Sequence, residues 1–227
     1  MAKAPKTAYV CNDCGAEFSR WQGQCSACKA WNTISEVRVI SASNSTKNDR
    51  FSGYAGETRA KIQTLSEISL QETPRFTSGF KELDRVLGGG IVPGSAILIG
   101  GHPGAGKSTL LLQVMCGLAK NMTALYVTGE ESLQQVAMRA NRLNLPTDKL
   151  NMLSETSVEQ ICNLADQLKP QIIVVDSIQV MHLSDIQSSP GSVAQVRECA
   201  SFLTRYAKTR QVAIIMVGHV TKDGTLA

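Results

Sequence analysis

The sequence has no apolar run long enough to cross a bilayer, since runs such as Ile172–Val175 span only a few residues. The first residues, MAKAPKTAYVCNDCG, lack the apolar core of a secretory signal. Aromatic residues make up only 5% of the chain, and the net charge is only +4. Such a small charge excess permits a nucleic-acid partner without requiring one. We therefore expect a soluble cytoplasmic protein without membrane association.

Three segments divide the 227 residues. Residues 1–36 carry a cysteine cluster and both tryptophans, residues 37–73 form a polar linker, and residues 74–227 alternate apolar strand-like runs with helix-like stretches. The chain closes on GHVTKDGTLA, without a capped helix or a polar tail. We expect the last domain to be incomplete at its C-terminal end.

The third segment predicts an α/β fold. Apolar runs indicate strands at 95–100, 123–128, 150–153, 171–176 and 212–217, and periodic stretches indicate helices at 107–120, 131–143, 157–168 and 192–209. Strands that alternate with helices pair in parallel through right-handed crossovers. We therefore expect a mostly parallel central sheet, with QIIVVD as a strand buried on both faces.

A glycine-rich turn joins the first of these strands to a helix. It matches G-x-x-x-x-G-K-[ST] at every position and consists of Gly101, His102, Pro103, Gly104, Ala105, Gly106, Lys107 and Ser108. Glycines let the backbone amides curl around an anion, and the helix dipole favours the same charge. The motif predicts an ATP site in which Lys107 reaches the β- and γ-phosphates, Ser108 binds Mg²⁺ and Thr109 approaches the α-phosphate. A purely structural turn is the alternative.

Polar residues come directly after three of the predicted strands. Asp176 ends Ile172–Val175 and is placed to hold the magnesium shell, or else to cap a turn. Glu130 and Glu131 come after TALYVT, and we select Glu130, nearer the strand end, to orient the attacking water. A helix-terminus charge is the alternative for Glu130 and the role we expect of Glu131. His219 comes after VAIIMVG as a γ-phosphate sensor or as a local hydrogen-bonding group.

The cysteines form two C-x-x-C pairs near the N-terminus, Cys11 with Cys14 and Cys25 with Cys28. Two such pairs present four thiolates at tetrahedral spacing, which predicts a structural Zn²⁺ site. A redox C-x-x-C is the alternative. Cys116, Cys162 and Cys199 are expected to be buried free thiols.

Four residues around these cysteines have two interpretations. Arg20, Trp21, Lys29 and Trp31 suit stacking and pairing with nucleic acid. Tryptophans packed over a small zinc core would give the same pattern, and the sequence does not decide between the two.

The motifs together resemble those of a known family. YVCNDCGAEFSRWQGQCSACKAWNTI is similar to the N-terminal zinc finger of the bacterial RadA (Sms) family of RecA-like DNA repair proteins. The similarity continues through TSGFKELDRVLGGGIVPGSAILIGGHPGAGKSTLLLQ, YVTGEES, VVDSIQ and SSPGSVAQVRE. It covers nearly the whole chain in order and implies a RecA-like P-loop NTPase core behind a small zinc-ribbon-like module.

This resemblance implies a DNA-dependent ATPase of homologous recombination that promotes branch migration on single-stranded or branched DNA. It also implies a homo-hexameric ring and a recombinase as a further partner. Glu130 takes the catalytic position, Asp176 that of the Walker B acid and His219 that of the phosphate sensor. Residues 182–196 correspond to a loop that faces DNA.

The chain differs from the family on the C-terminal side of the core. The Lys-Asn-Arg-Phe-Gly motif and the Lon-protease-like C-terminal domain do not occur in these residues. From the residues alone, a P-loop kinase of a small molecule and a zinc-finger adaptor switched by nucleotide remain alternatives to the ATPase.

Overall fold

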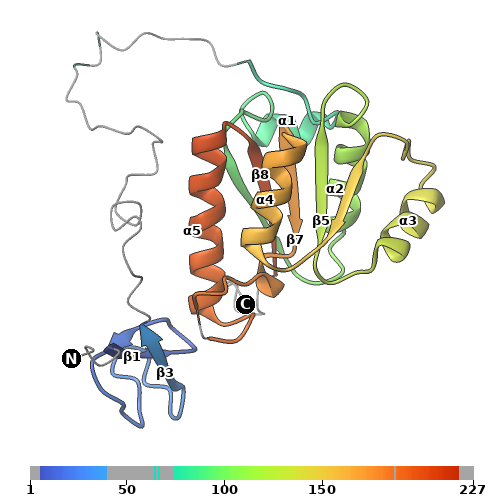
Figure 1. Cartoon of the computed structure of the whole chain (residues 1–227). Helices are drawn as coiled ribbons and strands as arrows, with labels where there is room; N and C mark the ends of the chain where they lie inside the picture. The colour runs from blue at the N-terminus through green and yellow to red at the C-terminus, as the bar shows by residue number, and fades with distance from the viewer. Residues whose placement is uncertain (1–5, 40–63, 65, 67–73, 187, 220–227) are drawn as a thin grey trace.

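The computed structural model describes residues 6–39, 64, 66, 74–186 and 188–219. Most of the predicted linker lies outside the described residues. Within them the chain forms a three-stranded antiparallel sheet and a five-stranded parallel sheet covered by helices (Figure 1).

The N-terminal sheet has the order β2-β1-β3 and is antiparallel throughout. Its strands are β1 Lys6–Cys11, β2 Glu17–Phe18 and β3 Ile34–Val39. We call the part of the chain from β1 to β3 the zinc module. Because β3 continues to Val39, the sheet extends beyond residue 36, where the first segment was expected to end.

The second sheet has the order β4-β8-β7-β5-β6, with every pair parallel. Its strands are β4 Ala96–Gly101, β5 Ala124–Thr128, β6 Asn151–Ser154, β7 Ile172–Asp176 and β8 Ala213–His219. The helices are α1 Lys81–Val86, α2 Lys107–Leu118, α3 Leu133–Arg142, α4 Val158–Leu168 and α5 Val193–Arg210, with the 3₁₀ turn η2 at Ile178–Val180. The expected α/β fold with a parallel sheet is confirmed.

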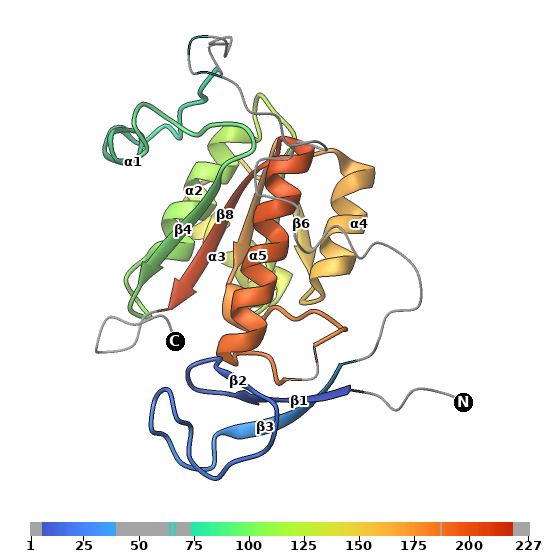
Figure 2. The same ribbon diagram turned by 90° about the vertical axis from the view of Figure 1, so that its left-hand side faces the viewer.

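Helices cover both faces of this sheet (Figures 1 and 2). Along β7, Ile172 and Val174 pack toward α2 and α3, whereas Ile173 and Val175 pack toward α4 and α5. Side chains alternate across a strand, so an apolar run without alternation fills two cores at once. This explains why QIIVVD has no polar face.

Three of the helices begin with a serine N-cap. Ser132, Ser157 and Ser192 are the N-caps of α3, α4 and α5, and each hydroxyl accepts a hydrogen bond from the backbone N–H three residues later. Such a cap satisfies one of the amide donors that a helix leaves free at its start. The N-cap of α2 is Gly106, which provides no side-chain cap.

No helix in the part of the chain that the structure describes combines the length and the apolar character needed to span a membrane.

Candidate functional site

The glycine-rich turn lies between the end of β4 and the start of α2. Gly104 and Gly106 have φ values of +80° and +85°, a left-handed conformation that side chains disfavour. A Cβ atom at either position would meet no atom within 4 Å. Glycine is therefore favoured at both positions by the positive φ value and not by a lack of space. Residues 102–106 are exposed, which leaves the loop open to a ligand.

The lysine of the motif is buried inside this loop. Lys107 is only 9% exposed, and its Nζ donates to the carbonyl oxygens of Gly101 at 2.7 Å and His102 at 2.9 Å. A Cβ built on Gly101 would lie 3.4 Å from Cδ of Lys107, so the glycine gives the lysine stem room to fold back. The ammonium group of Lys107 is thereby held against the backbone of the loop.

The start of α2 fits an anion. The serine-capped helices satisfy an amide of their first turn internally, whereas α2 has no such side-chain acceptor. Amides at a helix N-terminus bind phosphate well because the helix dipole favours negative charge there. Ser108 and Thr109 lie in the same first turn, both partly buried. The donor set therefore fits the phosphates of a nucleotide.

The sheet order brings the other predicted residues to the same edge. Gly101 pairs in register with His219, and Thr128 pairs with Asp176. Only β8 separates β4 from β7, so the ends of those two strands lie about 10 Å apart at the usual spacing of about 4.8 Å per strand. Parallel strands thus gather the loop, His219, Asp176 and Glu130 at their carboxyl ends.

Glu130 lies between two polar groups of this edge. Its Oε1 accepts a short hydrogen bond from the hydroxyl of Ser177 and lies 3.2 Å from Nε2 of His219. Ser177 is completely buried and is joined to Asp176 by a cis peptide bond. Glu130 is therefore oriented from two strand ends, those of β7 and β8.

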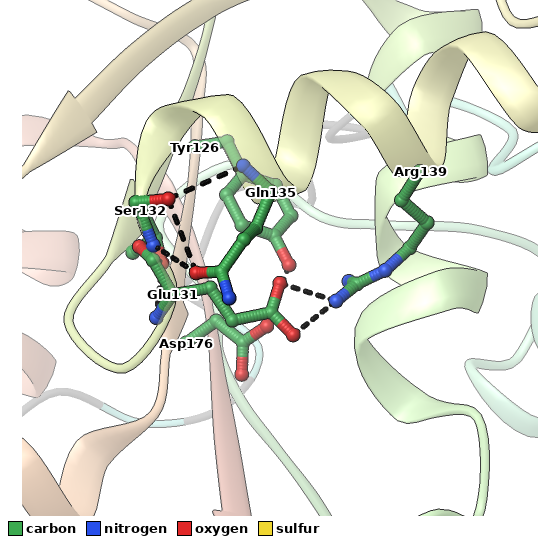
Figure 3. Close-up of polar contacts among 7 residues, drawn as sticks. Tyr126, Glu131, Ser132, Gln135, Arg139 and Asp176 are labelled. Atoms are coloured by element: carbon green, nitrogen blue, oxygen red, sulfur yellow. Dashed lines mark hydrogen bonds and ion pairs between the residues drawn. The ribbon is translucent and has the colours of Figure 1, made fainter.

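Glu131 points elsewhere. Both of its carboxylate oxygens pair with the guanidinium of Arg139 on α3, as Figure 3 shows. Helix α3 begins after Ser132 and has no acidic residue in its first turn. The expectation that Glu131 acts as an N-terminal helix charge is therefore wrong, because the helix starts only after its N-cap, Ser132, and the Glu131 carboxylate pairs with Arg139 instead.

Asp176 has a partner that the sequence pattern did not predict. The hydroxyl of Tyr126 donates to Oδ2 of Asp176 at 2.6 Å, from a side chain that is completely buried on β5. Burial, reinforced by the negative charge of Asp176, raises the pKa of Tyr126, so the phenol keeps its proton and acts as a donor. In Figure 3 the two residues lie beside the Glu131–Arg139 pair.

Tyr126, Ser177 and Arg139 are thus the contacts that sequence reasoning did not find. Tyr126 lies within the apolar run TALYVT, where an aromatic residue is expected in the core. The phenol hydroxyl of Tyr126 was the available signal, since a buried phenol requires an acceptor.

The four N-terminal cysteines converge, with all four Sγ atoms within 4.8 Å of one another. The Sγ atoms of Cys11 and Cys28 are 3.7 Å apart, and those of Cys14 and Cys25 are 3.5 Å apart. A zinc ion with Zn–S bonds of about 2.3 Å requires S···S distances of about 3.8 Å at tetrahedral angles. The thiols therefore fit a closed zinc site, which would supply folding energy to the module.

The two C-x-x-C turns have the same backbone hydrogen bonds. The carbonyl of Cys11 accepts from the N–H of Gly15, and the carbonyl of Cys25 accepts from the N–H of Lys29. Gly15 and Lys29 are both left-handed, with φ values of 74° and 64°. The repeated turn explains how a short segment presents two equivalent pairs of sulfurs.

The remaining cysteines, Cys116, Cys162 and Cys199, are buried, as expected. Burial raises the pKa of Cys162 and of Cys199 to about 12, so these thiols stay protonated at neutral pH.

The loop before α5 is tied to that helix by Gln195. This buried side chain donates to the carbonyls of Ile186 and Ser188 and accepts from the N–H of Leu183. Beside this loop lies the zinc module. Glu17 and Arg197 lie 3.7 Å apart across the contact, and Asn12 and Ser35 share a small polar recess with three serines, Ser188, Ser189 and Ser192.

Comparisons with known proteins agree with this geometry. Residues 60–225 match the family described as "AAA domain", and residues 9–36 match the family described as "Rubredoxin metal binding domain". Proteins named "DNA repair protein RadA" are similar over the whole chain. The one from Haemophilus influenzae is 93% identical, that from Escherichia coli 72% and that from Bacillus subtilis 45%.

The chain spans about half the length of these curated relatives, 49% of the first and 50% of the second. The AAA match covers most of the chain, and the four-cysteine match coincides with the converging sulfurs. The chain therefore belongs to the AAA domain family, in the RadA branch in which a zinc finger precedes that domain.

Proposed function

We propose that the chain carries the nucleotide-hydrolysing core of a DNA-dependent ATPase in recombinational DNA repair. The observation that carries the proposal is the position of Glu130, held by Ser177 and His219 at the sheet edge where α2 begins without a side-chain cap. The printed names of the relatives, which are DNA repair proteins, support the biological setting. We further propose segments 1–36, 37–73 and 74–227 as zinc finger, linker and ATPase core, with the last strand of the zinc finger continuing to Val39.

In this proposal the backbone N–H groups of the loop Gly101–Ser108, to which Pro103 contributes none, hold the phosphates of ATP. The ammonium of Lys107 exchanges its two loop carbonyls for β- and γ-phosphate oxygens. Glu130 orients a water molecule in line with the γ-phosphate, and His219 contacts both that phosphate and Glu130. Glu130 and His219 are already in contact at the carboxyl edge of the sheet, so these two side chains need little reorganisation when charge develops.

Ser108 and Asp176 are the residues that would hold Mg²⁺, a hydroxyl and a carboxylate being oxygen ligands that this ion prefers. When bound, the ion neutralises charge on the β- and γ-phosphate oxygens. The hydrogen bond from Tyr126 to Oδ2 fixes the orientation of the Asp176 carboxylate that would hold the ion.

The wider activity is proposed from the relatives and the resemblance. We propose single-stranded or branched DNA as the activating partner and branch migration as the work done. A homo-hexamer, a recombinase partner and a cytoplasmic location complete the proposal. Residues 182–196 are the part of the core proposed to face DNA.

Rates of ATP hydrolysis with and without single-stranded DNA test the proposal, in this chain and in a version extended to the length of its relatives. Glu130→Gln should lower turnover about 100-fold or more while ATP binding persists, because only the orienting carboxylate is lost. Glu131→Gln is the matched control, since Glu131 is paired with Arg139, and it should retain most activity.

Two outcomes would contradict the proposal. Transfer of the γ-phosphate to a small acceptor instead of water would indicate a kinase. Unchanged slow turnover in Glu130→Gln, with nucleotide-dependent changes in conformation intact, would indicate a nucleotide-switched adaptor.

A further inference from the structure

The zinc module exposes both tryptophans of the chain. Trp21 is 60% exposed and Trp31 is 69% exposed. In the described part of the module, the aromatic side chains that pack against the buried cysteines are Tyr9 and Phe18. The alternative in which the tryptophans cover the zinc core is therefore wrong, and both indoles face solvent.

Backbone pairing brings the two indoles together. Gln24 and Trp31 form an antiparallel bridge, and the N–H of Asn32 donates to the carbonyl of Gly23 at 2.8 Å. A Cβ atom built on Gly23 would lie 3.7 Å from Cη2 of Trp21 and 3.9 Å from Cζ3 of Trp31. Both rings thus converge over a residue that has no side chain of its own.

Two cations lie close to the tryptophans in the sequence. Residues 18–35 contain no aspartate or glutamate and carry Arg20 and Lys29 besides the zinc-site cysteines Cys25 and Cys28, whereas Asp13 and Glu17 precede them in the module. Both cations are exposed. We call the group Arg20, Trp21, Gly23, Lys29 and Trp31 the indole surface. It combines flat apolar rings with positive charge, the chemistry that binds unpaired bases and their phosphates.

The module lies at the end of the core where α5 begins, as both views show (Figures 1 and 2). A Cβ built on Gly15 would lie 3.5 Å from Val193 and 3.6 Å from Arg197, both in the first turns of α5. The indole surface is therefore carried by a module that adjoins the loop proposed to face DNA.

We propose that the indole surface is a binding site for single-stranded DNA, in which unpaired bases stack on Trp21 and Trp31 while Arg20 and Lys29 pair with phosphates. The inference rests on the proposed function, which it extends by assigning a DNA contact to the zinc module. A single strand is the favoured ligand because duplex bases are already stacked and cannot accept an indole face. Binding depends little on sequence, since every base has a π-face.

Intrinsic fluorescence tests this directly, because the chain has two tryptophans and both belong to the surface. Titration of the zinc-loaded chain with oligothymidylate, without nucleotide, should quench the tryptophan emission as bases stack. A duplex of the same length should quench much less at the same concentration.

Single substitutions distinguish the contribution of base stacking to DNA binding from that of positive charge. By anisotropy of labelled oligothymidylate, Trp21→Ala and Trp31→Ala should each weaken binding at least about fivefold, the lower end for loss of a stacked base. Trp21→Phe and Trp31→Phe should recover most of that loss. Lys29→Ala should reduce the salt dependence of binding by about 0.7 in log–log slope. Lys120→Ala, an exposed lysine beyond the C-terminal end of α2, is the matched control and should leave the slope unchanged.

The zinc content of each variant shows whether the module has folded, so a loss of binding in a zinc-loaded variant supports the site. The inference is wrong if oligothymidylate leaves the emission unchanged, or if zinc-loaded Trp21→Ala/Trp31→Ala binds it as tightly as the parent. Neither measurement involves ATP, so failure here is distinguishable from failure of the proposed hydrolysis.

Discussion

The zinc module and the parallel-sheet core differ in what stabilises their folded states. In the module, Cys11, Cys25 and Ile34 make up the buried cluster, with a few partly buried neighbours such as Tyr9 and Phe18. The core fills two apolar clusters, one on each face of its sheet, with side chains from strands and helices. A short segment cannot bury enough apolar surface to offset the entropy of ordering its chain, so a metal must supply the difference.

The two regions also differ in where they carry the side chains that are proposed to bind ligands. In the core the proposed functional groups lie at strand ends, where the buried side chains of Tyr126 and Ser177 fix the carboxylates of Asp176 and Glu130 in position. The module has only a small interior, and its candidate DNA-binding side chains, Trp21 and Trp31, lie on its surface. Orientation in the core comes from side-chain hydrogen bonds, whereas in the module the two indoles are brought together by backbone pairing around Gly23.

The largest expected effect is zinc removal, which should unfold the module and leave the core intact. Structural zinc sites contribute about 10–16 kcal/mol of apparent binding energy in small domains. Chelation should shift the emission of Trp21 and Trp31 while helical circular dichroism, which comes from the core, keeps its thermal midpoint. Added zinc should restore the emission. A matching fall in the helical midpoint would instead show that the two regions fold as one unit.

The substitution Ile173→Ala should destabilise the core by leaving a cavity in it, while the zinc module stays folded. Ile173 is 1% exposed on β7, and truncation of such a side chain costs about 2–5 kcal/mol. The helical signal should melt at a lower temperature, with the tryptophan emission below the transition unchanged. Leu164→Ala on α4 is the control, because Leu164 is 41% exposed and should cost little. Equal losses in the two variants would contradict the assigned core.

A smaller effect is expected for Tyr126→Phe, which removes one donor from Asp176. A hydrogen bond to a charged group contributes about 1.5–3 kcal/mol, and its loss frees the carboxylate to rotate. We expect a higher magnesium concentration for half-maximal ATP hydrolysis. Tyr206→Phe is the matched control, since Tyr206 donates to Asp166 at 2.8 Å on the surface between α4 and α5. A similar magnesium shift in both variants would assign Tyr126 a structural role only.

The smallest effect concerns the ion pair that joins the two regions. Arg197 and Glu17 are both more than half exposed, so their coupling should stay below about 1 kcal/mol. A double-mutant cycle of Arg197→Ala and Glu17→Ala, monitored by urea denaturation and tryptophan emission, measures it. Arg85 with Glu82 on α1 provides a reference exposed pair. A coupling clearly above that of the reference would mean that the core stabilises the module.

Much of this architecture could be predicted from local pattern. Apolar runs without alternation located β5, β7 and β8, because only strands covered on both sides tolerate such runs. Cysteine spacing located the zinc site because two short turns suffice to place four sulfurs. Glycine positions located the loop for the same reason: the conformation is local.

Contacts between distant strand ends could not be predicted in this way. The bond from Tyr126 to Asp176 joins residues that are 50 positions apart, and His219 lies 89 positions from Glu130. These pairings depend on the sheet order, which places β7 between β8 and β5. The exposure of Trp21 and Trp31 was undecided for a related reason, since only the packed module shows that Tyr9 and Phe18 fill its small interior.

The insertion of β8 between β4 and β7 has a consequence for the newly made chain. Until Ala213–His219 has left the ribosome, the glycine-rich loop and Asp176 belong to strands that have no common neighbour. A nascent polypeptide is therefore unable to assemble the proposed nucleotide site before β8 has been made, whereas the zinc module, complete by Val39, is free to fold earlier.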